Sequence, residues 1–119
     1  MTIKKTAIKT ARYSNVKRAK VSAIAFSGSG EIIATAHNRR VSGHTSKFTE
    51  HAEEVLIHKL KRLRAFKRYK NINVLVLRVS SNGVSMAKPC RKCRKILNQY
   101  PVSVSYSGWD GMLHKDIER

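Results

Sequence analysis

Two short clusters in this 119-residue chain carry side chains that can bind a metal and move a proton. A His-Ala-Glu sequence supplies His51 and Glu53, and a Pro-Cys-Arg-Lys-Cys sequence supplies Cys90 and Cys93. One histidine and two cysteines make three zinc ligands, which leave the fourth tetrahedral position open, as in catalytic sites. The remaining carboxylate suits proton transfer to and from a substrate. These residue types predict a catalytic Zn²⁺ held by His51, Cys90 and Cys93, with Glu53 as general acid and base.

The spacing within each cluster predicts a helix start. The two cysteines are three residues apart, so they share one face of a helix. Pro89 suits the first helical turn, and the N-terminus of a helix favours the thiolate that binds zinc. The histidine and the glutamate are only two residues apart and converge near a first turn, where Thr49 is the expected N-cap. We expect two helix N-termini to face each other across the metal.

The rest of the chain reads as alternating helices and strands of one domain, residues 1–119. Hydrophobic periodicity predicts helices near 2–14 and from about 50 to 70, and a third that starts at the cysteines. Strands are expected at 21–26, 31–36, 74–77, 102–106 and 112–117, with a loop over 39–48. Residues 74–77 are apolar in succession, as in a strand buried on both faces. The link 107–111 is too short for a helical crossover, so the last two strands should be antiparallel.

A His-x-Glu sequence followed by Pro-Cys-x-x-Cys resembles the signature of the cytidine deaminase-like zinc deaminases. The resemblance implies an α/β fold with three α-β-α layers and a mixed five-stranded sheet that ends in an antiparallel hairpin. That hairpin is similar to the cytidine and deoxycytidylate deaminase type, although a histidine ligand is commoner among the polynucleotide editors. The resemblance assigns the metal to His51, Cys90 and Cys93, and the general acid and base role to Glu53.

Contacts to a substrate are also implied by the resemblance. It places Asn38, Ala52 and Pro89 at the substrate, although an asparagine that ends a strand is also ordinary turn chemistry. His44 in the polar loop is a further candidate for the pocket. Trp109 is the only tryptophan, and it serves either as packing or as a surface on which a base stacks. Many relatives carry an acidic residue before the Pro-Cys sequence, where this chain has a lysine.

The charge predicts an anionic partner. The chain has 25 Lys and Arg against 7 Asp and Glu, a formal net charge of +18, and it has no acidic residue from Val55 to Trp109. Such a field attracts polyanions whatever their sequence. Because basic residues surround both cysteines, we expect a substrate with its own phosphate. The candidates are a cytidine or deoxycytidine nucleotide and single-stranded DNA or RNA.

The predicted reaction is the hydrolytic deamination of cytosine to uracil with release of ammonia. Three alternatives stay open. In the first, the base is adenine or guanine instead of cytosine. In the second, the protein is a non-catalytic, zinc-stabilised module that binds nucleic acid. In the third, the zinc is structural and takes its fourth ligand from His37, His44 or His58.

The sequence says less about the cellular location and the oligomeric state of the protein. No apolar run approaches the length of a membrane span, and no signal peptide is evident, so we expect no membrane partner. Two cysteines in metal spacing suit a reducing compartment, which predicts a cytoplasmic location. The resemblance implies a homo-oligomer, whereas the charge of +18 opposes close association of copies.

Overall fold

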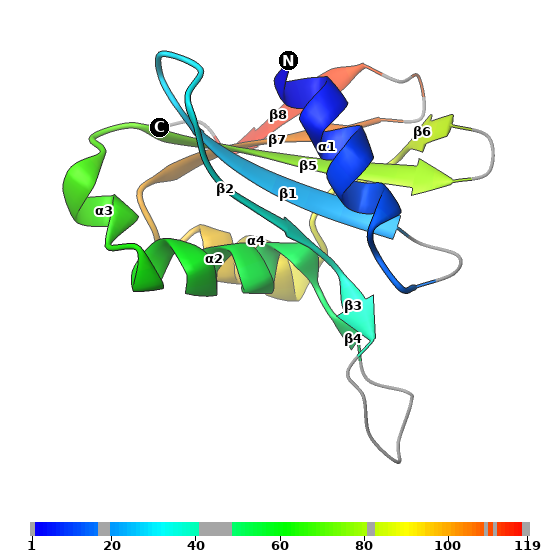
Figure 1. The fold of residues 1–119 in the computed structure, drawn as a ribbon, viewed down its shortest axis with the longest axis horizontal. Helices are drawn as coiled ribbons and strands as arrows, with labels where there is room; N and C mark the ends of the chain where they lie inside the picture. The colour runs from blue at the N-terminus through cyan, green and yellow to red at the C-terminus, as the bar shows by residue number, and fades with distance from the viewer. Residues whose placement is uncertain are drawn as a thin grey trace.

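The computed structural model describes residues 2–16, 20–40, 49–80, 83–108, 110 and 112–117. Helices and strands alternate along the chain, as Figure 1 shows. The helices are α1 (Ile3–Arg12), α2 (Ala52–Arg62), α3 (Ala65–Arg68) and α4 (Arg91–Leu97). The strands are β1 (Lys20–Ser27), β2 (Ile32–His37), β3 (Arg39–Arg40), β4 (Thr49–Glu50), β5 (Ile72–Ser80), β6 (Gly83–Ser85), β7 (Val102–Ser107) and β8 (Leu113–Ile117).

The main sheet is mixed, with the strand order β2-β1-β5-β7-β8. Only the β5–β7 pair is parallel, and the other neighbours along this path are antiparallel. The expected five strands and the antiparallel C-terminal hairpin, β7–β8, are thus confirmed. The short strand β6 pairs with the end of β5 and makes a sixth strand that the sequence did not predict.

Helices cover both faces of the sheet and give three α-β-α layers, with α1 on one side and α2 and α4 on the other (Figure 1). Alternate residues of β5 enter two separate cores. Leu75 and Leu77 pack with Ala7 of α1, whereas Val74 and Val76 pack in the larger core with Leu56 of α2. Apolar residues therefore occur in succession along β5 because both of its faces are buried, as predicted.

The second helix is shorter than expected. The sequence predicted one helix from about residue 50 to 70, but α2 ends at Arg62 and α3 begins at Ala65. The break is at Arg64, whose φ of 55° and ψ of 34° lie in the left-handed region. The prediction was wrong here because no glycine or proline marks the break in the sequence.

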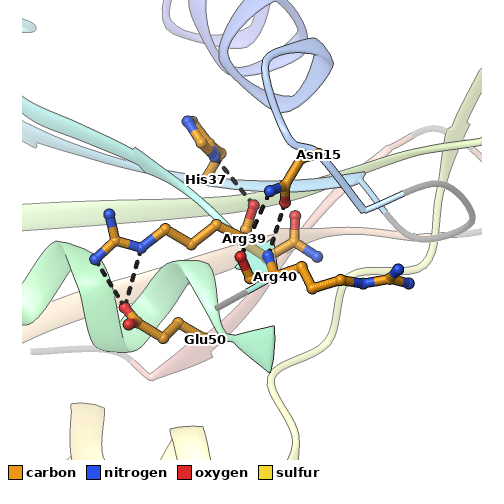
Figure 2. A network of polar contacts seen from close by, with 6 residues as sticks. Asn15, His37, Arg39, Arg40 and Glu50 are labelled. Carbon is orange, nitrogen blue, oxygen red and sulfur yellow. Dashed lines mark hydrogen bonds and ion pairs between the residues drawn. The ribbon is translucent and has the colours of Figure 1, made fainter. Parts of the chain in front are cut away.

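The segment before α2 also differs from the prediction. Residues 39–48 were expected to form a loop, yet β3 and β4 pair antiparallel in a separate two-stranded sheet. Figure 2 shows the contacts that hold it: Arg39 and Glu50 form an ion pair, and the backbone N–H of Arg40 donates to Asn15 Oδ1 at 2.7 Å. Within the described ranges, no helix is long and apolar enough to cross a membrane.

Candidate metal and catalytic site

The three predicted metal ligands meet at the starts of two helices. His51 is the N-cap residue of α2 and Cys90 that of α4, and Cys93 lies in the first turn of α4. Their donor atoms all lie within 4.8 Å of one another. His51 Nδ1 is 3.2 Å from Cys93 Sγ and 3.7 Å from Cys90 Sγ. Tetrahedral zinc, with bonds of about 2.3 Å to sulfur and about 2.0 Å to nitrogen, holds such atoms about 3.6 Å apart. The cluster therefore fits Zn²⁺.

Backbone conformation explains why these side chains are available to a metal. His51 and Cys90 are both extended, with ψ of 146° and 167°, and neither side chain caps its own helix by a hydrogen bond. Thr49 was predicted to be the N-cap of α2. That prediction was wrong, because β4 pairs with β3 as far as Glu50 and the helix begins only after His51. An ion pair of 3.7 Å between Lys92 Nζ and Glu54 Oε1 joins the first turns of α4 and α2.

Burial controls the electrostatics of the cluster. Glu53 is 5% exposed, and burial raises the pKa of its carboxyl, partly offset by its own backbone N–H and by His51. Cys93 is fully buried, and burial together with the Glu53 carboxylate raises the pKa of its thiol. A thiolate at this position thus requires a compensating cation, and a metal ion supplies one. Cys90 is exposed, so the cluster opens to the surface on that side.

A cavity of about 270 Å³ lies against the cluster. Its lining includes His51, Ala52, Glu53 and Cys90, together with Asn38 from the end of β2. The size is just below the range of about 300–1,000 Å³ that is usual for small-molecule sites. Four side chains that the sequence analysis placed at one site therefore line one cavity, along with Ala52, a predicted substrate contact.

Asn38 is held in place by hydrogen bonds to its side-chain oxygen. Ser14 Oγ donates to Asn38 Oδ1 at 2.7 Å, and the backbone N–H of Val21 donates to the same atom at 2.9 Å. Asn38 is buried, with 9% of its surface exposed. These two hydrogen bonds fix the chain at the end of β2 and also orient the amide of Asn38 in the cavity wall. The turn role and the substrate contact that were predicted for Asn38 are therefore compatible.

Arg78 of β5 is a cavity residue that the sequence analysis did not single out. Its Nε atom is buried and meets no hydrogen-bond acceptor among the described residues. Buried Ser107 fixes the local backbone: its Oγ accepts from the N–H of Arg78 at 3.2 Å and donates to the carbonyl of Ser85 at 2.6 Å. The sequence did carry one sign of this residue, because Arg78 is a charged residue that interrupts the apolar run of β5.

Lys88, beside Pro89, is also part of the cavity lining and is exposed.

Some predicted residues lie elsewhere. Pro89 is buried directly before Cys90, but it is not part of the cavity lining. His44 and Trp109 lie outside the described residues. Among the residues described, no second histidine joins the metal cluster as a fourth ligand. His37 Nδ1 instead contacts the carbonyl of Asn38 at 3.0 Å, and His58 is exposed on α2.

The comparisons with known proteins agree with this geometry. A family model described as the cytidine and deoxycytidylate deaminase zinc-binding region matches residues 1–107. No curated protein matches the chain. The structure resembles the crystal structure of cytidine deaminase from Mycobacterium leprae, with a TM-score of 0.59 and 20% identity over 93% of this chain and 87% of that one. It also resembles the cytidine deaminase from Burkholderia pseudomallei, with a TM-score of 0.61 and 16% identity over 98% and 93% of the two chains.

Proposed function

The chain belongs to the family of zinc-dependent cytidine and deoxycytidylate deaminases, and on this premise we propose that it converts cytosine to uracil in a phosphate-bearing substrate. Water is consumed and ammonia is released, so the amino group of the base is replaced by oxygen. One observation carries the proposal: a buried carboxylate, Glu53, lines the same cavity as the histidine and cysteine donors. A structural zinc site has no use for such a carboxylate, whose burial is costly.

His51, Cys90 and Cys93 would hold the zinc ion, which when bound supplies a Lewis acid that makes water nucleophilic near neutral pH. Glu53 takes a proton from the attacking water and passes it to the ring nitrogen. It then takes the remaining proton from the hydroxyl group that has added to the ring carbon and gives it to the departing amine, so that the C–N bond breaks as the C=O bond forms. Its raised pKa brings the carboxyl closer to the pH at which it must both accept and release a proton. Asn38 in the cavity wall orients the nucleoside through its amide.

The base and the phosphate are assigned on separate grounds. Cytosine is favoured because the two solved structures compared above are cytidine deaminases. A phosphate is favoured because the cavity lining includes two cations, Arg78 and Lys88. The guanidinium of arginine matches the geometry of a phosphate, and the exposed lysine adds a positive charge. The single domain of residues 1–119 is proposed to contain the whole site.

Ammonia release tests the proposal directly. The zinc-loaded chain is assayed side by side with cytidine, deoxycytidylate, adenosine and a single-stranded oligonucleotide that contains one cytosine. We expect the highest kcat/KM with a phosphate-bearing cytosine substrate. Faster release from adenosine would move the activity to purines. Absence of release from every substrate, with zinc present at one equivalent, would leave a non-catalytic binding module.

A further inference from the structure

A second cavity, of about 570 Å³, lies at the opposite end of α2 from the metal cluster. It is formed where the last turn of α2, the short helix α3 and the turn after α4 come together, and it is lined by Lys61, Arg64, Phe66, Lys67, Tyr100 and Pro101. The eleven residues of α2 span about 16 Å at 1.5 Å per residue, so the two cavities are separated by about one helix length. Figure 1 shows α3 at the end of α2 that lies away from β3 and β4.

The charged side chains of this cavity are all cations. Lys61, Arg64 and Lys67 are its charged lining residues, and no carboxylate is among them. None of the three forms an ion pair with an acidic residue in the part of the chain that the structure describes. Three exposed cations within seven residues create a local positive potential, which favours a ligand with more than one negative charge.

The apolar part of the cavity is aromatic. The rings of Phe66 and Tyr100 stack, with centroids 5.1 Å apart and planes at 20°. Lys61 Nζ lies 5.8 Å from the centroid of the Tyr100 ring, which brings a cation beside the aromatic surface. A combination of cations with aromatic rings is the arrangement by which proteins bind single-stranded nucleic acid, because phosphates contact the cations while bases contact the rings.

The backbone at Arg64 adds a separate observation. Arg64 is the one non-glycine residue with positive φ among the described residues, and the left-handed region favours glycine. The chain thus carries an arginine at a position where glycine would be less strained. Strained positions of this kind cluster at ligand-binding sites. The strain also supplies a useful test variant, since glycine at this position removes the charge and relieves the backbone.

We propose that this second cavity binds single-stranded nucleic acid, with phosphates on Lys61, Arg64 and Lys67 and a base against Phe66 and Tyr100. The cavity is remote from the metal cluster and takes no part in the chemistry. Nucleic-acid binding at the second cavity can therefore be measured separately from the deamination proposed above.

The test is a titration of a fluorescent oligothymidylate of about ten nucleotides, which contains no cytosine and reports binding without turnover. Fluorescence anisotropy of the full zinc-loaded chain is followed between about 50 and 200 mM salt. The triple variant Lys61→Gln, Arg64→Gly, Lys67→Gln should bind on the order of tenfold more weakly at low salt. The slope of log affinity against log salt should become shallower by about 2, because each phosphate contact to a single strand contributes about 0.7.

A matched control removes the same number of charges from the opposite face of the sheet. Lys5, Lys9 and Arg12 are exposed on α1, and their replacement by glutamine lowers the net charge equally. An equal loss of binding in this control would overturn the proposal, because it would show that only the total charge matters. Arg64→Gly alone should bind more weakly while its Tm is not lowered, which separates a lost contact from a damaged fold.

A further arm tests the aromatic part. An abasic strand of the same length carries the phosphates without the bases, and we expect it to bind more weakly than oligothymidylate. Equal binding of the two strands would contradict the contact between a base and the Phe66–Tyr100 pair. All of these measurements are independent of ammonia release, so their failure and the failure of the proposed deaminase activity are distinguishable.

Discussion

Arg39 and Glu50 face each other across the β3–β4 pair, and both Nε and Nη2 of Arg39 lie within 3.2 Å of Glu50 Oε2 (Figure 2). Asn38 directly precedes Arg39, and His51 directly follows Glu50. The ion pair therefore closes the two-stranded sheet beside the site. Asn38, which lines the cavity, lies immediately before β3, and His51, a candidate metal ligand, lies immediately after β4. Two residues thirteen positions apart are brought to the same cavity by this pairing.

Loss of this ion pair should alter the site more than the fold. The pair is half exposed, and such pairs contribute about 0–1 kcal/mol to stability, so Glu50→Gln should change Tm little. We expect kcat/KM to fall severalfold, because Asn38 and His51 lose their fixed separation. A double-mutant cycle with Arg39→Gln, read on kcat/KM, measures the coupling. Additive effects of the two substitutions would contradict a positioning role for the pair.

Glu53→Gln should slow turnover strongly while it stabilises the fold. Burial raises the pKa of Glu53, so this group lowers the stability of the fold once the pH exceeds about 4.3, the pKa of glutamate in the unfolded chain. Glutamine removes this cost, and Tm of the metal-free variant should rise. We expect kcat to fall by about 10²–10⁴, the usual contribution of a general acid and base, with zinc content unchanged by elemental analysis.

Glu54 provides the matched control for this experiment. It is the next residue of α2, it is more exposed, and it forms an ion pair with Lys92 rather than lining the cavity. Glu54→Gln should retain turnover and gain no stability. If Glu53→Gln kept a rate close to that of the wild type, the assignment of the general base would be wrong.

The site was predictable where its chemistry is local in sequence. The spacing of Cys90 and Cys93 predicted that both sulfur atoms lie at the start of one helix, as they do in α4. Burial of Cys93 was predicted from the hydrophobic periodicity of the same helix and is confirmed. Arg78 was not predictable, because its place in the cavity depends on the pairing of β5 with β7 and on Ser107, twenty-nine residues away.

The fold was predictable where the hydrophobic pattern is strong. The apolar run of β5 predicted a strand that is buried on both faces, whereas β3 and β4 consist of polar residues such as Arg39 and Thr49. Their pairing is set by cross-strand contacts that no periodicity reveals. The break at Arg64 was also missed, because arginine does not favour the left-handed region and the hydrophobic pattern carries no sign of a residue in that conformation.

Removal of zinc should destabilise the protein, most strongly at alkaline pH. In the metal-free fold the pKa of the Cys93 thiol is raised, whereas in the unfolded chain a thiol ionises near pH 8.5. The free energy of unfolding of the chelated protein should therefore fall as the pH rises above about 8.5. Zinc binding is linked to loss of thiol protons, so zinc affinity rises over the same range.

Thermal unfolding with and without a chelator measures both effects. At neutral pH, zinc at about a thousandfold above its Kd contributes about 4 kcal/mol, so chelation should lower Tm by about 10 °C or more. Cys93→Ala is the control: its Tm should respond weakly to the chelator, and the alkaline loss of stability should disappear. A chelator response as large as that of the wild type would show that the stabilising metal is held elsewhere.

Arg78 should determine the preference for a phosphate-bearing substrate. Arg78 lines the cavity, and its buried Nε donates to no described residue, so the phosphate of the proposed substrate would supply an acceptor for it. A hydrogen bond to a charged group contributes about 1.5–3 kcal/mol, which corresponds to about 10–150-fold in affinity. Arg78→Met should therefore raise KM for deoxycytidylate by this factor and change KM for cytidine by less than about threefold.

Lys88 is the comparison for this prediction, because it lines the same cavity but is exposed. Lys88→Met should weaken deoxycytidylate binding less than Arg78→Met does, and added salt should remove most of its effect, since an exposed charge is screened. The Arg78 effect should persist in salt, because Arg78 is partly buried and its Nε is fully buried. An equal rise of KM for cytidine and deoxycytidylate in Arg78→Met would mean that Arg78 supports the cavity wall rather than the phosphate, and the nucleotide preference would then have to come from the exposed cations alone.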